Sequence, residues 1–212
     1  MGIVFGSTGT KEPGFRLLTT IGSAEIRHYR PYVVAEVMNL QGESNSNNNF
    51  GVLARYIGVF GKPENQRAKP MAMTSPVISE GQKLAMTSPV VTGTSDESMA
   101  FVLPEEIQSI GQAPVPTDQR VVLREVPTRI IASFRYSGWY NKEVALRHAN
   151  TLRRHLTELK LLSDGADETY EVAQYHPPFT LGPFRRNEIW IPLEENNPEV
   201  RALVQSSKVT SA

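Results

Sequence analysis

A short sequence pattern occurs twice in this chain, and the two copies are 97 residues apart. The stretch 27–37 reads RHYRPYVVAEV and the stretch 124–134 reads REVPTRIIASF, so in each copy an arginine is followed six positions later by two β-branched residues and an alanine. Adding 97 to the residue number at which a first helix is predicted to start gives a position inside a predicted second helix. Adding 97 to two later apolar segments gives positions next to two predicted strands. One offset thus aligns four elements, which predicts two β-β-α-β-β halves related by approximate two-fold symmetry.

Local patterns supply the elements that such halves need. Runs of valine, isoleucine and aromatic residues between turn residues predict strands. These runs are Phe15–Ile21, Ala24–Tyr29, Tyr32–Met38, 99–103, 120–126, Arg129–Tyr136, 170–175 and 188–192. Apolar residues at helical spacing predict a first helix over about 49–60, and Asn141 is expected to cap a second, longer helix. The two halves are expected to span about 15–103 and 118–195. Strand 99–103 is expected to be an insertion between the repeated elements of the two halves.

Two such halves most simply share one antiparallel sheet that curls towards a barrel, with one helix from each half packed against it. The prediction is an α+β fold: a distorted antiparallel β-barrel in a single domain over 15–195, with tails over 1–14 and 196–212. The C-terminal tail has little to bury, so it is expected to be mobile.

The motif Ala-Met-Thr-Ser-Pro-Val also occurs twice, at 72–77 and at 85–90. Two apolar runs separated by a polar segment with a glycine predict a β-hairpin over 71–91, with Val77 opposite Met86. The prolines cannot donate to a ladder, so the hairpin is expected to be bulged or at a sheet edge near them. Its methionines are either a wall for a bulky apolar ligand or flexible filling of an ordinary core.

Composition argues against several classes of function. Lysine plus arginine and aspartate plus glutamate number 22 each, so no net charge favours nucleic acid or an anionic membrane as a partner. The absence of cysteine excludes disulfides and thiolate ligands. No phosphate loop, dinucleotide fingerprint or nucleophile elbow is present, and Glu36 or Glu188 as a catalytic base lacks partner residues. With no signal peptide and no run of transmembrane length, a cytoplasmic protein without catalysis is expected, and the sequence leaves the organelle open.

Four histidines are candidates for metal ligation. His28 shares a strand face with Ile26, towards the expected interior, and both a structural role and ligation are open for it. His148 and His155 are seven positions apart on one predicted helix, too far to hold one metal ion, and are expected at the helix boundary. His176 precedes two prolines in a long loop, where exposure is expected.

Several segments of the chain resemble the SOUL haem-binding protein family. They are EIRHYRPYVVAEV, the helix ending in ARYIG, the doubled AMTSPV, the FVLP strand and PPFTLGPFRRNEIWIPLE. The resemblance covers about 15–194, and the doubled motif is most similar to plant and algal members. It implies a distorted antiparallel barrel flanked by two long helices, as in bacterial effector-binding domains of the GyrI type. It also implies non-covalent binding of haem or metal-free protoporphyrin without catalysis.

A porphyrin is a flat apolar disc with two propionates, so it needs an apolar slot with cations at the rim. The expected slot lies beside the first helix, and its predicted residues are Phe50, Leu53, Ala54, Ile57, Met71, Met73 and Met86. The predicted propionate contacts are Lys83, Arg185 and Arg186. The two arginines have an alternative role as a solvated pair that fixes the terminal loop. Some family members have a proposed axial histidine in the EIRHY segment, and His28 matches its position.

Two functions of different classes fit this sequence. The first is a carrier or buffer that holds haem loosely for transfer to a protein acceptor. The second is a protein-interaction or small-effector module that uses the same groove for a helix or an unrelated apolar ligand. No nucleic-acid partner is expected, and the sequence does not indicate an oligomeric state.

Overall fold

The computed structural model describes residues 12–38, 46–59, 61–68, 70–72, 75–81, 98–163, 168–176 and 180–209. In these parts of the chain, nine strands form one antiparallel sheet. The strands are β1 (Phe15–Ile21), β2 (Ala24–Tyr29), β3 (Tyr32–Met38), β4 (Val77–Gly81), β5 (Ser98–Val102), β6 (Val121–Val126), β7 (Arg129–Tyr136), β8 (Tyr170–Gln174) and β9 (Asn187–Leu193). The helices are α1 (Ser46–Ile57), α2 (Lys142–Glu158) and α3 (Pro198–Val209), with single 3-10 turns η1 (Ile110–Gln112) and η2 (Gly182–Phe184).

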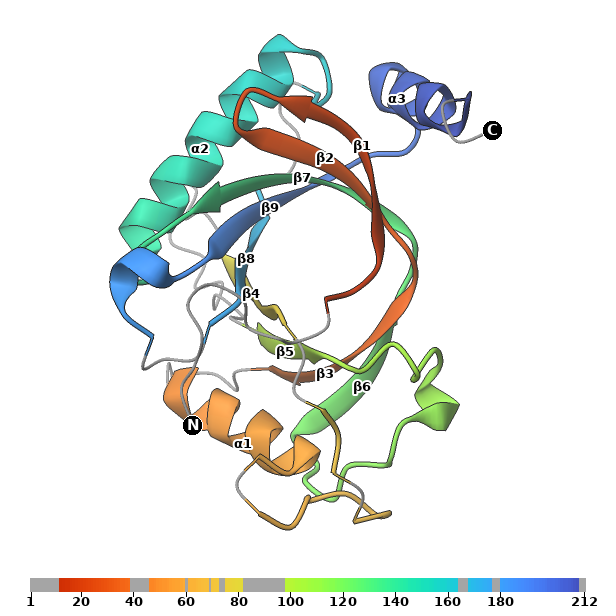
Figure 1. The fold of residues 1–212 in the computed structure, drawn as a ribbon, viewed down its shortest axis with the longest axis vertical. Coiled ribbons are helices and arrows are strands. Elements are labelled where there is room, and N and C mark those ends of the chain that lie inside the picture. The colour runs from red at the N-terminus through yellow and green to blue at the C-terminus, as the bar shows by residue number, and fades with distance from the viewer. Residues whose placement is uncertain are drawn as a thin grey trace, which may run out of the picture.

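The sheet curls around a central axis into an open barrel (Figure 1), with the strand order β1-β2-β7-β9-β8-β4-β5-β3-β6. α1 and α2 lie outside the curled sheet, on different parts of its outer face. α1 packs on β3, β5 and β6, and α2 packs on β9. The predicted α+β class and the curled antiparallel sheet are confirmed.

The strand order is symmetric about the β8·β4 pair once β1 is left out, so that β2, β7, β9 and β8 correspond to β6, β3, β5 and β4. The ladders have the same register in both halves, because Arg27 lies opposite Ile131 and Arg124 lies opposite Val34. Val34 and Ile131 are both buried in one core cluster inside the barrel. The 97-residue repeat is therefore a structural repeat, as predicted.

The strand predicted at 99–103 was expected to be an insertion, and this expectation is wrong. β5 is the fourth strand of the first half: Ala35 lies opposite Phe101 just as Ala132 lies opposite Ile191. Phe101 and Ile191 are 90 residues apart, so the offset of 97 fails beyond the helices. The connections after α1 and α2 differ in length, whereas the ladder fixes which residues are equivalent.

The predicted hairpin between the two AMTSPV copies is also wrong in its register. Val77, at the end of the first copy, lies opposite Phe101 of β5 and Gln174 of β8. Both edges of β4 are thus occupied at Val77, so Val77 does not pair with Met86. The second copy lies outside the described residues, together with Met73 and Lys83. β4 begins directly after Pro76, in agreement with the expectation that the proline interrupts pairing.

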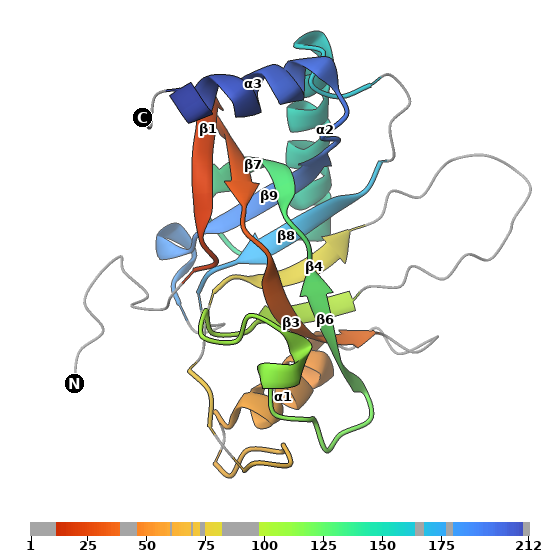
Figure 2. The ribbon, with the colours of Figure 1, turned by 90° about the vertical axis from the view of Figure 1, so that its right-hand side faces the viewer.

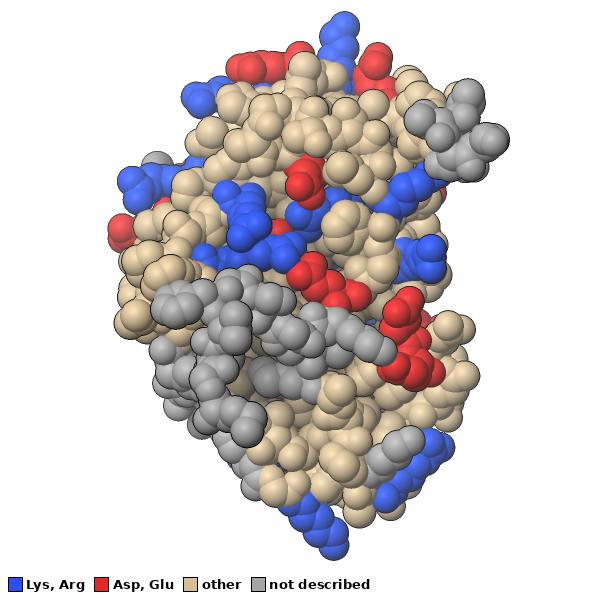
Figure 3. Space-filling model, in the orientation of Figure 1, with Lys and Arg blue, Asp and Glu red and all other residues tan. Residues whose placement is uncertain are grey.

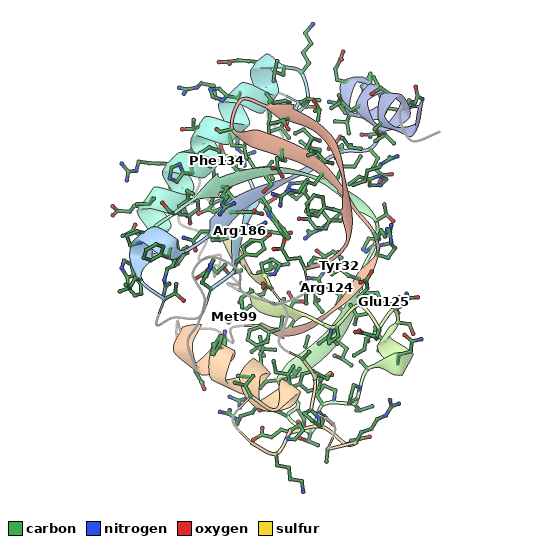
Figure 4. The ribbon with its side chains drawn as sticks, in the orientation of Figure 1. Tyr32, Met99, Arg124, Glu125, Phe134 and Arg186 are labelled. Carbon is green, nitrogen blue, oxygen red and sulfur yellow. The ribbon has the colours of Figure 1, made fainter. Side chains whose placement is uncertain are left out.

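The outer face of the sheet carries two apolar clusters, one under each helix. α2 is capped by Asn141, whose side chain accepts hydrogen bonds from the backbone N–H of Glu143 (2.8 Å) and Val144 (3.2 Å). Its buried residues recur at the predicted spacings of four and three, and they are Ala145, Ala149, Leu152 and Leu156. In Figure 4, Phe134 points from β7 towards α2 and Met99 points from β5 towards α1.

The C-terminal segment was expected to be a mobile tail, but it forms α3. Asn197 caps this helix by accepting from the backbone N–H of Glu199 (2.9 Å). Val200 is fully buried, and α3 lies against β1 at the top of the molecule (Figure 2). Leu203 and Val204 of α3 also pack against the core cluster under α2, so these apolar contacts and the cap together fix the helix. Among the described residues, no helix is long and apolar enough to cross a membrane.

Candidate functional site

The interior of the barrel contains a buried carboxylate surrounded by donors. Glu188 of β9 is 0% exposed. Its oxygens accept hydrogen bonds from Arg27 Nη1 (2.7 Å), Arg186 Nε (2.9 Å), Ser133 Oγ (3.0 Å), Tyr175 OH (2.8 Å) and Trp190 Nε1 (2.8 Å). These donors come from β2, β7, β9 and the segment after β8, so the carboxylate joins strands that lie far apart in the sequence.

The charges of this network depend on one another. Burial raises the pKa of Glu188, but hydrogen bonds and the positive charges of Arg27 and Arg186 outweigh burial and lower the pKa to about 2. Burial lowers the pKa of Arg27, but Glu188 outweighs it and raises the pKa well above its ordinary value. Glu188 is therefore ionised and engaged at neutral pH, which leaves it unsuited to act as a general base.

Residues of the segment PPFTLGPFRRNEIWIPLE form part of this network and the loop beside it. The Arg186 guanidinium stacks on the Tyr175 ring, with its Cζ 3.7 Å from the ring centroid. It also donates to the Glu12 carboxylate through Nη1 (2.7 Å) and Nη2 (3.2 Å). Arg185 is buried over the Trp139 ring, with its carbon Cζ 3.9 Å from the ring centroid. Figure 4 shows Arg186 at the opening of the barrel. Both arginines are thus bound by groups of the protein itself. The predicted alternative was a solvated pair, but Arg185 is buried and Arg186 is only partly exposed.

A second polar cluster fills the other part of the interior. Arg129 forms an ion pair with Glu171 and donates to the Tyr32 hydroxyl. Arg124 Nε binds Glu36 at 2.8 Å. The cavity among these side chains measures only about 20 Å³. A ligand of porphyrin size needs several hundred Å³, so this part of the interior has no room for one.

Beside α1 the surface has a much larger hollow of about 520 Å³. It is lined by Arg67, Pro70, Met71, Ala72, Pro104, Glu106, Ile107, Gln112 and Pro114. Two hydrogen bonds tie its walls to α1: Met71 N–H donates to the Ile57 carbonyl (2.9 Å), and the Tyr56 hydroxyl donates to the Pro114 carbonyl (2.8 Å). A hollow of this volume with a mainly apolar lining is within the usual range of about 300–1,000 Å³ for small-molecule sites.

The structure places only part of the predicted slot at this hollow. Met71 lines it. Phe50 packs at the edge of the core under α1, while Leu53, Ala54 and Ile57 are buried there against the sheet. The apolar face of α1 therefore covers the barrel, and the hollow is formed by the segments around it.

Sequence reasoning did not identify the wall opposite Met71. This wall consists of Pro104, Ile107 and Pro114, from the connector between β5 and β6. The proline-rich composition of that connector was visible in the sequence, and prolines fix an extended backbone that suits a wall.

His28 lies away from the hollow beside α1. It lies on β2, between β1 and β7, whereas α1 packs on β3, β5 and β6. Its Nδ1 is 3.4 Å from Arg16 Nη2. No group of three or more potential metal ligands is found among the described residues. His176 was expected to be exposed, but it is half-buried and its Nδ1 accepts from Arg186 N–H (3.0 Å).

Side chains thus fill the core of the barrel, and a ligand-sized hollow lies on its outer side, beside α1. This chain belongs to the SOUL heme-binding protein family, whose model matches residues 10–192. Membership indicates haem or a related tetrapyrrole as the ligand, in a family of binding proteins. No curated protein shows significant sequence similarity to the chain.

Solved structures share the fold at low sequence identity. A protein from Listeria innocua described as a hydrolase has 10% identity and a TM-score of 0.51, and the match covers 81% of this chain and 92% of that one. EcmrR in a complex with DNA has 11% identity and a TM-score of 0.52, with 81% of this chain and 57% of that chain covered. At such identities the likeness concerns the fold alone.

Proposed function

We propose that this protein binds haem or metal-free protoporphyrin non-covalently in the hollow beside α1, and that it carries or buffers the ligand for transfer to a protein acceptor. The observation that supports this location is the mainly apolar hollow of about 520 Å³, next to a barrel interior that its own side chains occupy. Arg67 at the hollow is the described cation suited to a propionate. Lys83, Met73 and Met86 are proposed as further contacts with the ligand, and these three residues lie outside the described parts of the chain.

Apolar contact is sufficient for useful affinity at such a site. Burying a few hundred Å² of a porphyrin face contributes several kcal/mol at about 25 cal/mol per Å². Among the described residues that line the hollow there is no histidine, so the proposed binding there rests on apolar contact. A ligand held in this way dissociates readily, which suits a carrier.

Aspartate at Met71 or Ile107 is expected to weaken binding of both hemin and metal-free protoporphyrin at least ~10-fold, because the carboxylate must be desolvated beneath the ring. Both residues are only partly buried, so the variants test binding, whereas aspartate at the buried Leu53 or Ile57 would test folding. Absorbance titration gives the affinities. Val122→Asp, on an exposed valine of β6 outside the hollow, is the matched control.

Unchanged affinity of folded Met71→Asp and Ile107→Asp proteins for both ligands would place the tetrapyrrole elsewhere. Tight binding of an apolar peptide in this hollow, with no binding of either porphyrin, would instead support the protein-interaction or small-effector function.

His28→Ala is expected to leave the hemin affinity within about twofold and the Soret band unchanged, since His28 lies on a part of the sheet that α1 does not cover. The measurement is the absorbance spectrum of the hemin complex, with metal-free protoporphyrin as the control. A Soret shift confined to hemin would show that His28 does ligate the iron and that the ligand lies on the β2 side.

A further inference from the structure

Three large apolar side chains are exposed together at the η2 loop. They are Trp139 (59% exposed), Leu181 (66%) and Phe184 (50%), and we call them the Trp139 surface. Trp139 follows β7, while Leu181 directly precedes η2 and Phe184 is its last residue, in the loop that leads into β9. The two loops are joined by a hydrogen bond from Gly138 N–H to the Gly182 carbonyl (3.0 Å). Large exposed apolar side chains on two joined loops are typical of an interaction surface.

The exposed tryptophan is held in a fixed position. Its ring lies against Gly182, where a Cβ atom would be only 2.9 Å from Trp139 Nε1. Arg185 covers the ring, and Arg185 Nε is itself fixed by the Thr180 carbonyl (2.8 Å). Asn187 Nδ2 donates to the Gly138 carbonyl (2.9 Å) and fixes the backbone before the ring. A side chain that is already ordered loses little conformational entropy on binding, which is how a preorganised anchor gains affinity.

Arginines gather beside the Trp139 surface. Burial lowers the pKa of His176, and the positive charges of Arg186, Arg185 and Arg135 also lower this pKa. A hydrogen bond from the Arg186 backbone raises the pKa but does not outweigh these effects. Of these arginines, Arg185 lies over the Trp139 ring, and the backbone N–H of Arg186 donates to His176. In Figure 3, uncharged residues cover the region of the η2 loop at the left of the view, with Lys and Arg side chains above it and towards the centre and acidic side chains at the left edge.

The exposed charges next to the Trp139 surface are mainly positive. Arg135 and Lys142 are both exposed, and Glu143 is the acidic neighbour in this stretch of chain. This local excess exists although the whole chain has equal numbers of basic and acidic residues. The local charge is thus complementary to a negatively charged partner surface.

We propose that the Trp139 surface docks the protein onto an anionic lipid membrane, with Trp139, Leu181 and Phe184 at the headgroup level and Arg135 and Lys142 towards the lipid phosphates. Tryptophan and phenylalanine flanked by basic residues suit the membrane interface, which is apolar on one side and wet on the other. The three apolar side chains line neither of the hollows at α1 and inside the barrel. They stand on loops, and protruding anchors suit a fluid surface. This docking does not depend on where the tetrapyrrole binds.

The chain provides its own reporter for this proposal. It has two tryptophans, Trp139 and Trp190, and Trp190 is fully buried. With phosphatidylcholine vesicles containing roughly one-third phosphatidylserine, the emission of Trp139 is expected to shift to the blue and the protein to sediment with the vesicles. Pure phosphatidylcholine vesicles are expected to bind it more weakly, and salt is expected to weaken binding to the anionic vesicles.

Leu181→Asp and Phe184→Ser are each expected to weaken vesicle binding about tenfold while keeping Trp139 as the reporter. Leu159→Asp is the matched control, because Leu159 is 47% exposed at the far end of α2. Arg135→Gln is expected to weaken binding to the anionic vesicles alone.

Three results would overturn the proposal. The first is that the wild-type protein does not bind the anionic vesicles at low salt. The second is that Leu181→Asp and Phe184→Ser bind them as the Leu159→Asp control does. The third is a blue shift that grows with protein concentration without lipid and is lost in Leu181→Asp, which would assign the surface to contact between two copies of this chain.

Discussion

Glu188→Gln is expected to lower the free energy of unfolding by about 3–5 kcal/mol. The amide has nearly the same shape as the carboxylate, so no cavity is created. It cannot neutralise Arg27 and Arg186. In either orientation its NH2 group faces donors, which are Trp190 and Tyr175 at the site of one carboxylate oxygen and Arg186 at the site of the other. Two buried guanidinium groups then lose their common counter-charge. Chemical denaturation monitored by the fluorescence of the buried Trp190 measures the loss.

The same network gives the stability a defined pH dependence. The pKa of Glu188 is lowered from its ordinary value of 4.5 to about 2 in the folded protein. A lowered pKa contributes stability above the unfolded-state value, and this contribution is lost as the pH falls from about 4.5 through about 2. The loss is of order 3 kcal/mol, and it is expected to be absent in Glu188→Gln.

Glu64→Gln is the control for the Glu188 variant. The Arg55–Glu64 ion pair joins two largely exposed side chains, so its removal is expected to cost less than about 1 kcal/mol. A cost of similar size for Glu188→Gln would mean that water replaces the lost interactions, and the network would then not hold the barrel together.

Truncation of Ile131 or Val34 to alanine is expected to cost about 2–4 kcal/mol in either half. The two side chains occupy equivalent ladder positions opposite Arg27 and Arg124, and both are buried inside the barrel. Thermal and denaturant unfolding of each variant measures the cost, and Val122→Ala at an exposed site of β6 is expected to stay within about 0.5 kcal/mol. A large effect in one half and none in the other would show that the two positions are equivalent in geometry but not in stability.

Local patterns in the sequence were sufficient to locate most elements. The bounds of β1, β2, β3 and β7 agree with the predicted ranges, because β-branched and aromatic runs between turn residues have few alternatives to a strand. Asn141 was identified as a cap because its short side chain can accept hydrogen bonds from the first free N–H groups of the helix. The repeat around Arg27 and Arg124 also predicted the two-fold relation of the halves, which the matching ladders confirm.

The candidate site could be predicted only in part from the sequence. Met71 was identified from its methionine-rich motif, but the opposite wall at Ile107 comes from a segment without a repeating pattern. Leu53 and Ile57 have the same helical spacing whether they face a ligand or the sheet, so periodicity alone cannot separate a slot from a core.

The sequence by itself determined the class of elements, their order, the duplication and the family. Only the tertiary structure decided which strands flank β4, that α3 forms over β1, and that Arg186 and Glu188 face each other inside the barrel. Strand pairing joins residues such as Val77 and Gln174 that are far apart along the chain, and the pairing energy depends on both partners. A buried charge likewise persists only where its counter-charges meet it, as Arg27 meets Glu188 from the other end of the chain.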